Sequence, residues 1–128
     1  MKKIFLAAGI IAFVVLSIYS CCKAGMDGKA EIVGSVYHHA KPIPGATIYI
    51  KFGVSEFPGP VTSNYDDSVT GPVNSNVVTI KNLHCGTYYL YGVGYDSAIY
   101  LPVTGGIKVQ IKHSERDQQL KTNVPVTE

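Results

Sequence analysis

Apolar side chains recur at every second position along much of this chain, and this period restricts its fold more than any other feature. In the segment 46–52, Ala46, Ile48, Ile50 and Phe52 alternate with polar or aromatic residues, and the segment 107–111 repeats the pattern. Successive residues of a strand point to opposite faces of a sheet, so each segment predicts a strand with one buried face. No segment after the first 22 residues has the 3.6-residue period of a helix.

Six or seven short strands are expected in one domain that spans residues 30–128. They cover residues 30–37, 46–52, 78–80, 87–95, 99–103, 107–111 and 120–124. Pro44-Gly45 suits a type II turn in the first hairpin, and Thr104-Gly105-Gly106 is expected to turn the chain. The long segment 53–76 is rich in Gly, Pro, Ser, Asn and Asp, so it is either functional or contains a short strand. These short strands, with turns between them, predict an all-β, two-sheet sandwich, with a barrel as the alternative.

The first 20 residues predict an export signal. Lys2 and Lys3 precede a nearly unbroken apolar run from Ile4 to Leu16, which is shorter than the about 20 residues of a membrane-spanning helix. The run leads to Ile18-Tyr19-Ser20-Cys21, which resembles the bacterial lipobox. This resemblance implies cleavage before Cys21, acylation of Cys21, and attachment to a membrane of the cell envelope. The outer membrane is favoured, and which face it occupies stays open. An ordinary secreted protein and an uncleaved helix are the alternatives.

Residues 21–29 are expected to form the lipidated cysteine and a short tether. Cys22 lies in this tether and Cys85 at the entry to a strand, and an exported protein could pair them. We expect instead that Cys85 is a small buried residue, with the disulfide as the alternative. Removal of Lys2 and Lys3 with the signal leaves 9 of the 11 basic residues against 9 acidic ones. This balance gives no support for a nucleic-acid partner.

Two stretches of the chain carry a family resemblance. The first is Gly34-Ser35-Val36 followed by Lys41-Pro42-Ile43-Pro44-Gly45-Ala46-Thr47-Ile48, and the second runs from Val78 and Ile80 through Leu83, Gly86 and Tyr88 to Leu90. In this order they resemble the carboxypeptidase regulatory-like domains, whose fold is an immunoglobulin-like, transthyretin-like sandwich. The resemblance implies an accessory or interaction module without a reaction of its own. Leu83 is expected to plug one end of the sandwich, and Gly86 to allow a tight entry into the next strand.

No group of residues predicts catalysis or metal binding. His38, His39, His84 and His113 lack the spacing of a zinc site, so we expect turn or surface histidines and no metal. Asn64, Asp66, Asp67 and Asn74 follow no calcium-loop pattern and are expected to be solvated. Neither a Gly-x-Ser-x-Gly nor a His-x-x-Glu motif occurs, so neither an enzyme nor a cofactor is expected.

Aromatic residues give the remaining functional hypotheses. Tyr89, Tyr91 and Tyr95 would share one face of their strand, opposite Tyr88 and Leu90. Packing in a core is the favoured structural explanation of this face. The leading functional hypothesis is a membrane-anchored module that contacts an envelope protein through Phe57, Tyr65, Tyr89 and Tyr91. The alternative is a glycan-binding module that uses Tyr89, Tyr91 and Tyr95 as a platform.

Overall fold

The computed structural model describes residues 22–128 of the chain, and the predicted signal and acylation site at Cys21 lie outside this part. Eight strands and two short 3-10 turns follow one another. They are β1 (Met26–His38), β2 (Lys41–Pro42), β3 (Thr47–Phe52), η1 (Thr62–Asn64), β4 (Asp67–Thr70), β5 (Val77–Leu83), β6 (Gly86–Asp96), β7 (Leu101–Ile111), η2 (His113–Glu115) and β8 (Gln119–Val126). Within residues 22–128, no helix is long and apolar enough to cross a membrane.

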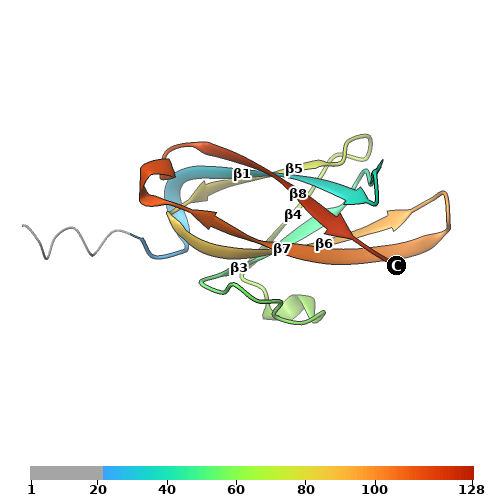
Figure 1. The fold of residues 1–128 in the computed structure, drawn as a ribbon, viewed down its shortest axis with the longest axis horizontal. Coiled ribbons are helices and arrows are strands. Elements are labelled where there is room, and N and C mark those ends of the chain that lie inside the picture. Colours follow the sequence, from blue (N-terminus) through green and yellow to red (C-terminus); the bar gives the residue numbers. More distant parts are fainter. Residues whose placement is uncertain (1–21) are drawn as a thin grey trace, which may run out of the picture.

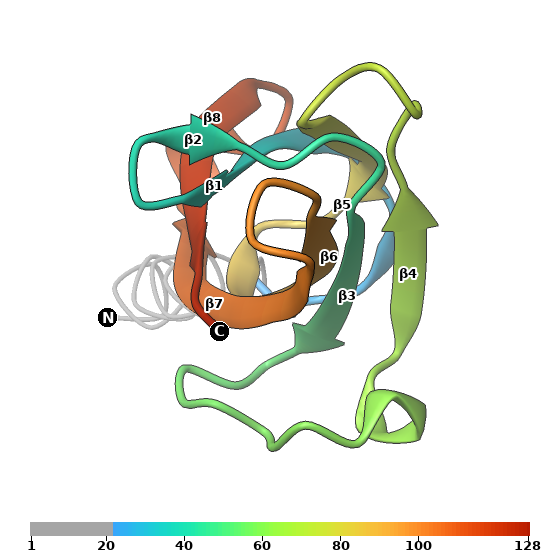
Figure 2. The ribbon, with the colours of Figure 1, turned by 90° about the vertical axis from the view of Figure 1, so that its right-hand side faces the viewer.

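The strands form two packed sheets, which confirms the predicted all-β sandwich (Figure 1). In the first sheet, β1 pairs antiparallel with β2 and β5 and parallel with β8. The second sheet has the order β4-β3-β6-β7, and all its pairs are antiparallel. The sheets meet along one edge, where Thr104 of β7 and Thr127 exchange two backbone hydrogen bonds of 2.8 and 2.9 Å. Viewed along its length, the molecule is almost closed on that side (Figure 2).

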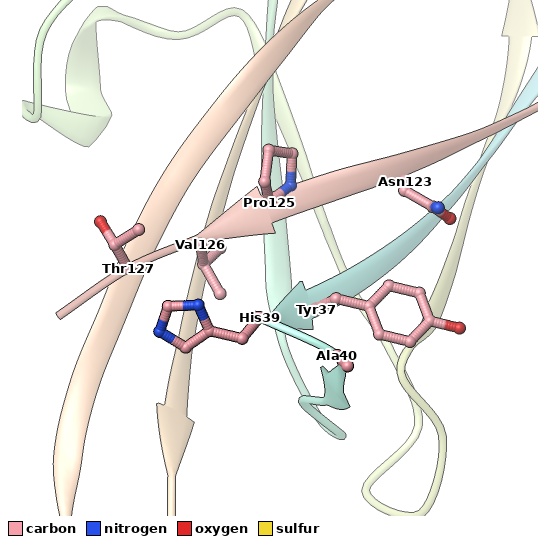
Figure 3. Close-up of a pocket in the computed structure, with 7 residues that line it drawn as sticks. All are labelled: Tyr37, His39, Ala40, Asn123, Pro125, Val126 and Thr127. Carbon is pink, nitrogen blue, oxygen red and sulfur yellow. The ribbon is translucent and has the colours of Figure 1, made fainter.

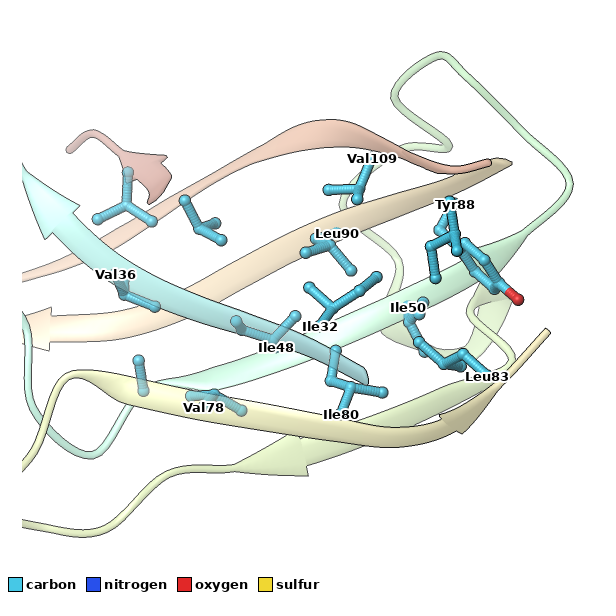
Figure 4. Close-up of a cluster of buried hydrophobic side chains, with 14 of the residues drawn as sticks. Ile32, Val36, Ile48, Ile50, Val78, Ile80, Leu83, Tyr88, Leu90 and Val109 are labelled. Atoms are coloured by element: carbon cyan, nitrogen blue, oxygen red, sulfur yellow. The ribbon is translucent and has the colours of Figure 1, made fainter. Parts of the chain in front are cut away.

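The core lies between the sheets and follows directly from the alternation in the sequence. Ile32 and Val36 point inward from β1, Ile48 and Ile50 from β3, and Leu90 from β6, and each of these side chains is fully buried (Figure 4). Leu83 is also completely buried, at the end of the sandwich where the described chain begins. Burial of a branched side chain of this size stabilises the fold by about 1.5–3 kcal/mol, so this layer supplies most of the stabilisation.

The prediction of a turn at Thr104-Gly105-Gly106 is wrong, because β7 runs straight through these residues. A side chain on Gly105 would place its Cβ 2.4 Å from the carbonyl oxygen of Pro125. A side chain on Gly106 would place its Cβ 2.3 Å from the carbonyl oxygen of Leu90. The two glycines therefore serve the close approach of neighbouring strands and not a reversal of the chain.

The tether expected over residues 21–29 is largely part of the domain. The first strand begins at Met26, and Cys22 forms a disulfide with Cys85. The expectation of an unpaired, merely buried Cys85 is therefore wrong. The Tyr88 hydroxyl also holds this segment to the domain. It accepts a hydrogen bond from the N–H of Gly25 at 3.0 Å and donates one to the carbonyl of His84 at 2.7 Å. The predicted acylation site, Cys21, is the residue directly before Cys22 in the sequence.

The first hairpin differs from its prediction, whereas the segment 53–76 contains a short strand, as one of its two expected explanations required. The first hairpin turns at His39-Ala40, whereas Pro44-Gly45 carries the chain from the first sheet to the second. Gly45 has the positive φ, +69°, that a type II turn requires. The segment 53–76 contains the short strand β4, which pairs with β3 at the edge of the second sheet. The part of this segment before β4 crosses the outer face of that sheet (Figure 2).

Candidate functional site

The outer face of the second sheet carries a cluster of five aromatic residues, which we call the aromatic cluster. Its members are Tyr49 of β3, Tyr89 and Tyr91 of β6, and Phe57 and Tyr65 of the segment between β3 and β4. Because Tyr88 and Leu90 point into the core, the residues between and beyond them in β6 point outward.

The rings of the aromatic cluster contact one another closely. The Tyr65 ring stacks on that of Tyr91 with centroids 5.5 Å apart and an interplanar angle of 16°. The Phe57 ring lies between Tyr91 and Tyr89, at 5.3 and 5.9 Å. The Tyr65 hydroxyl donates a hydrogen bond of 2.9 Å to the carbonyl of Gly59, which closes the segment upon itself. These are favourable ring separations, worth about 0.5–1.5 kcal/mol each beyond area burial.

The segment between β3 and β4 is fixed at its far end by a carboxylate. Asp66 accepts a hydrogen bond from the backbone N–H of Phe52 at 2.7 Å through Oδ2, and Lys51 lies 3.5 Å from Oδ1. Asp66 therefore holds the loop to the end of β3. Its neighbour Asp67 accepts a hydrogen bond from the N–H of Ser68 through Oδ1 at 2.8 Å.

Exposure differs sharply within the aromatic cluster. Tyr91 is 4% exposed because Phe57 and Tyr65 cover it, whereas Phe57 itself is 52% exposed. Burial raises the pKa of Tyr65 to about 12, with a smaller contribution from the neighbouring Tyr91 and Tyr89. Burial also raises the pKa of Tyr89. Phe57 is thus an accessible apolar side chain that lies on Tyr89 and Tyr91, which form the base of the aromatic cluster.

A glycine of the neighbouring strand makes room for the base of the aromatic cluster. Gly106 of β7 pairs with Tyr91, and a Cβ at Gly106 would lie 2.6 Å from Cε1 of Tyr89. The Tyr89 ring therefore lies over the backbone of β7, in the space that a side chain at position 106 would occupy.

The structure brings together all four residues that the sequence suggested for partner binding. Phe57, Tyr65, Tyr89 and Tyr91 belong to the aromatic cluster, and sequence reasoning missed its fifth member, Tyr49, which pairs directly with Tyr91 across β3 and β6. Tyr95 is 52% exposed near the end of β6 and makes no ring contact with any residue in the described range. No protein-family model matches the chain, and no curated protein matches it in sequence. Any functional assignment therefore depends on the residues of this chain alone.

A second group of polar residues lies at the end of the sandwich that carries the β1–β2 and β6–β7 turns. His38 is only 6% exposed, and its Nδ1 donates a hydrogen bond of 2.8 Å to Oδ2 of Asp96, which is 3% exposed. The other oxygen of Asp96 accepts hydrogen bonds from Lys41 Nζ at 2.6 Å and from the N–H of Ala98 at 3.0 Å. Asp96 therefore links the two turns.

The expectation that His38 is a surface or turn residue is wrong. The inward alternation of Ile32, Gly34 and Val36 continues one step further along β1, so His38 points into the sandwich. This continuation of the period was the signal in the sequence. The hydrogen bond to Asp96 raises the pKa of His38, and the same bond, with the Lys41 contact, holds the pKa of Asp96 well below its usual range. His39, His84 and His113 are exposed, as expected.

A hollow of about 510 Å³ lies beside His39, between the end of β1 and the end of β8 (Figure 3). The ring of His39 and the side chain of Val126 lie along it, with Tyr37 at its other side. On the other side of the turn, a second hollow of about 500 Å³ is lined by His38, His39, Lys41, Asp96 and Ile99, with Ala40 and Ala98. His39 thus lies between two concave surfaces.

Proposed function

We propose that this chain is a non-enzymatic lipoprotein of a bacterial cell envelope, anchored to a bilayer through acylated Cys21, whose sandwich acts as an interaction or structural accessory module for an envelope protein. The observation that carries the proposal is the exposure of Phe57 on the aromatic cluster. Aromatic residues held rigidly in place give large contact area at low entropic cost, which is the property of residues that dominate protein interfaces.

The packing beneath Phe57 supports a protein partner better than a glycan. A sugar platform made by Tyr89, Tyr91 and Tyr95 needs three accessible rings on one face. Tyr91 lies under Phe57 and Tyr65, and Tyr95 stands apart from the cluster. Glycan binding therefore requires the segment between β3 and β4 to move, whereas a protein partner can contact Phe57 with this segment in place.

Two further observations support the non-enzymatic assignment and the resemblance to carboxypeptidase regulatory-like domains. The second ring nitrogen of the buried histidine, Nε2 of His38, pairs with the carboxylate of Glu128 and not with a hydroxyl or thiol nucleophile. Leu83 and Gly86, which belong to the resemblance, occupy the expected places. Leu83 is fully buried at one end of the sandwich, and a Cβ on Gly86 would lie 2.6 Å from the backbone nitrogen of Ala24.

Site-specific photo-crosslinking in intact cells tests the partner contact. A photoreactive residue at position 57 is expected to give one discrete adduct with an envelope protein. Val73 is 91% exposed and lies outside the aromatic cluster, so the same residue at position 73 is the matched control and should give no such adduct. Equal labelling from both positions, or none from position 57, contradicts the proposal.

The lipid anchor and the glycan alternative have their own measurements. Mass spectrometry of the native protein should show an N-terminal Cys21 that carries acyl chains, and an unmodified sulfur rejects the anchor. Binding to a glycan array that is lost with Tyr89→Ala would favour the alternative over the protein-interaction module.

A further inference from the structure

Two imidazoles and a carboxylate converge at the turn end of the sandwich. Nitrogen atoms of His38 and His39 and a carboxylate oxygen of Glu128 all lie within 4.8 Å of one another. His38 lies at the end of β1, His39 begins the β1–β2 turn, and Glu128 follows β8, which runs parallel to β1. The parallel pairing of β1 and β8 therefore brings together residues that are 90 positions apart in the sequence.

The ring nitrogen Nε2 of His38 is the unusual atom of this group. The side chain is more than nine-tenths buried, and Nε2 is the ring nitrogen that does not contact Asp96. Oε2 of Glu128 forms an ion pair with this nitrogen at 2.5 Å. The buried nitrogen therefore already has a carboxylate beside it, and buried groups of this kind are either paired with each other or coordinate a metal.

The hydrogen bond on the other ring nitrogen prepares Nε2 to bind a cation. A carboxylate only accepts hydrogen bonds, so Nδ1 of His38 carries the proton in its 2.8 Å contact with Asp96. When the ring is neutral the lone pair is on Nε2, so a metal ion that binds there displaces the proton that the two neighbouring carboxylates favour. A carboxylate that holds a histidine in this way is the usual outer partner of a histidine that binds a metal, because it fixes the ring and makes the ligand more basic.

The backbone conformation of His39 brings a second imidazole ring beside that of His38. Neighbouring strand residues point to opposite faces, so His38 and His39 would normally diverge. His39 has a left-handed φ of +55°, which breaks the alternation, and the centroids of the two rings lie 4.5 Å apart. A residue other than glycine in this region is uncommon and is often found at functional sites.

Charge and geometry both suit a divalent cation. Asp96 is neutralised by its contact with Lys41, so Glu128 supplies the net negative charge of the group. Tetrahedral zinc with bonds of about 2.0–2.1 Å places its ligand atoms about 3.3 Å apart. The three atoms reach that spacing from a mutual distance of at most 4.8 Å by side-chain rotation, because His39 and Glu128 are both exposed.

We infer that His38 Nε2, His39 and the Glu128 carboxylate bind one divalent transition-metal ion, with Zn²⁺ as the ion that this nitrogen-rich ligand set favours. Asp96 is the positioning residue that holds His38 through Nδ1. Three protein ligands leave a fourth position, which would take water or a side chain of a partner. The ion would join the end of β8 to the β1–β2 turn.

Isothermal titration of the purified full-length protein with zinc chloride tests this inference. One saturable site per chain is expected. Glu128→Gln and His39→Asn should each weaken zinc binding at least tenfold, and asparagine tolerates the left-handed backbone of position 39. Both residues are exposed, so the variants should fold, which circular dichroism checks. The matched control is His84→Ala, an exposed histidine outside the group, and it should bind zinc like the wild type.

A second measurement reports on the ligands directly. Zinc should shift the NMR signals of the His38 and His39 rings and leave those of the His84 ring unchanged, and it should raise the melting temperature of the wild type but not of His39→Asn. Absence of saturable binding at micromolar zinc, or equal binding by the wild type and His39→Asn, overturns the inference.

Discussion

The disulfide between Cys22 and Cys85 allows the sharpest quantitative test of the fold. Reduction of the purified protein removes this bond without any change of sequence. Cys22 is exposed near the start of the described chain, whereas Cys85 is 3% exposed at the entry to β6. The bond thus joins the first residues of the domain to the start of its most extensively paired strand.

The expected loss of stability follows from the length of chain that the bond closes. The two cysteines are 63 positions apart. In the chain-entropy description, closing a loop of this length stabilises the native state by about 4 kcal/mol, because the unfolded chain loses conformational freedom. For a domain of roughly 100 residues, the unfolding entropy of about 2.1 cal/mol/K per residue converts this loss into a drop in melting temperature of roughly 20 °C.

Guanidinium denaturation and thermal melts of oxidised and reduced samples measure this difference. Cys22→Ser in non-reducing buffer is the matched variant and should reproduce the reduced wild type. Cys85→Ser should be less stable than either, because it also places a hydroxyl in a buried site. A melting temperature that falls by less than about 5 °C on reduction would refute the reasoning, since it would mean that the loop is not closed in the native protein.

Three further predictions concern the aromatic cluster. Tyr91→Ala should cost about 3 kcal/mol of unfolding free energy and Phe57→Ala about 1, because the first ring is buried and the second half exposed, and urea titration of both variants decides the order. Gly106→Ala should lower stability by about 1–3 kcal/mol in the same assay, since its Cβ would meet the carbonyl of Leu90, and an unchanged midpoint would reject the close approach of β6 and β7. Burial raises the pKa of Tyr65 to about 12, above its unfolded value of about 10. The stability that comes from keeping the Tyr65 hydroxyl protonated in the folded state is therefore complete below pH 10 and is lost as the pH rises towards 12. Tyr65→Phe should therefore flatten the decline of stability in this range, and parallel declines would exclude Tyr65 as its source.

The sequence predicts the architecture well because burial in a sandwich depends on a local period. The alternation from Ile48 to Phe52 is enough to identify β3 and its inward face. The errors occur where a distant residue decides the local structure. Gly105 resembles a turn residue until Pro125, 20 positions away, is seen to occupy the space of its side chain. No local period marks such an approach.

The aromatic cluster and the histidine group show the same division between local and distant information. Tyr89 and Tyr91 follow from the period of β6, but their burial depends on Phe57 and Tyr65, which a loop of irregular backbone carries across the sheet. His38 follows the period of β1, yet its pairing with Asp96 spans 58 positions. The local period identifies some of the residues in such cases, but Tyr49 and Asp96 join their groups only through the tertiary structure.

The disulfide between Cys22 and Cys85 determines how a domain anchored through Cys21 would hold its exposed face. A pull on the acylated cysteine enters the described fold at Cys22 and divides between β1, which follows, and Cys85, which directly precedes β6. Because β6 pairs with both β3 and β7, the load reaches the centre of the second sheet without peeling β1 away. The same strand β6 carries the base of the aromatic cluster. If Cys21 is acylated as proposed, the anchor and Phe57 would therefore be connected through the second sheet, and this sheet would set the height of Phe57 above the bilayer.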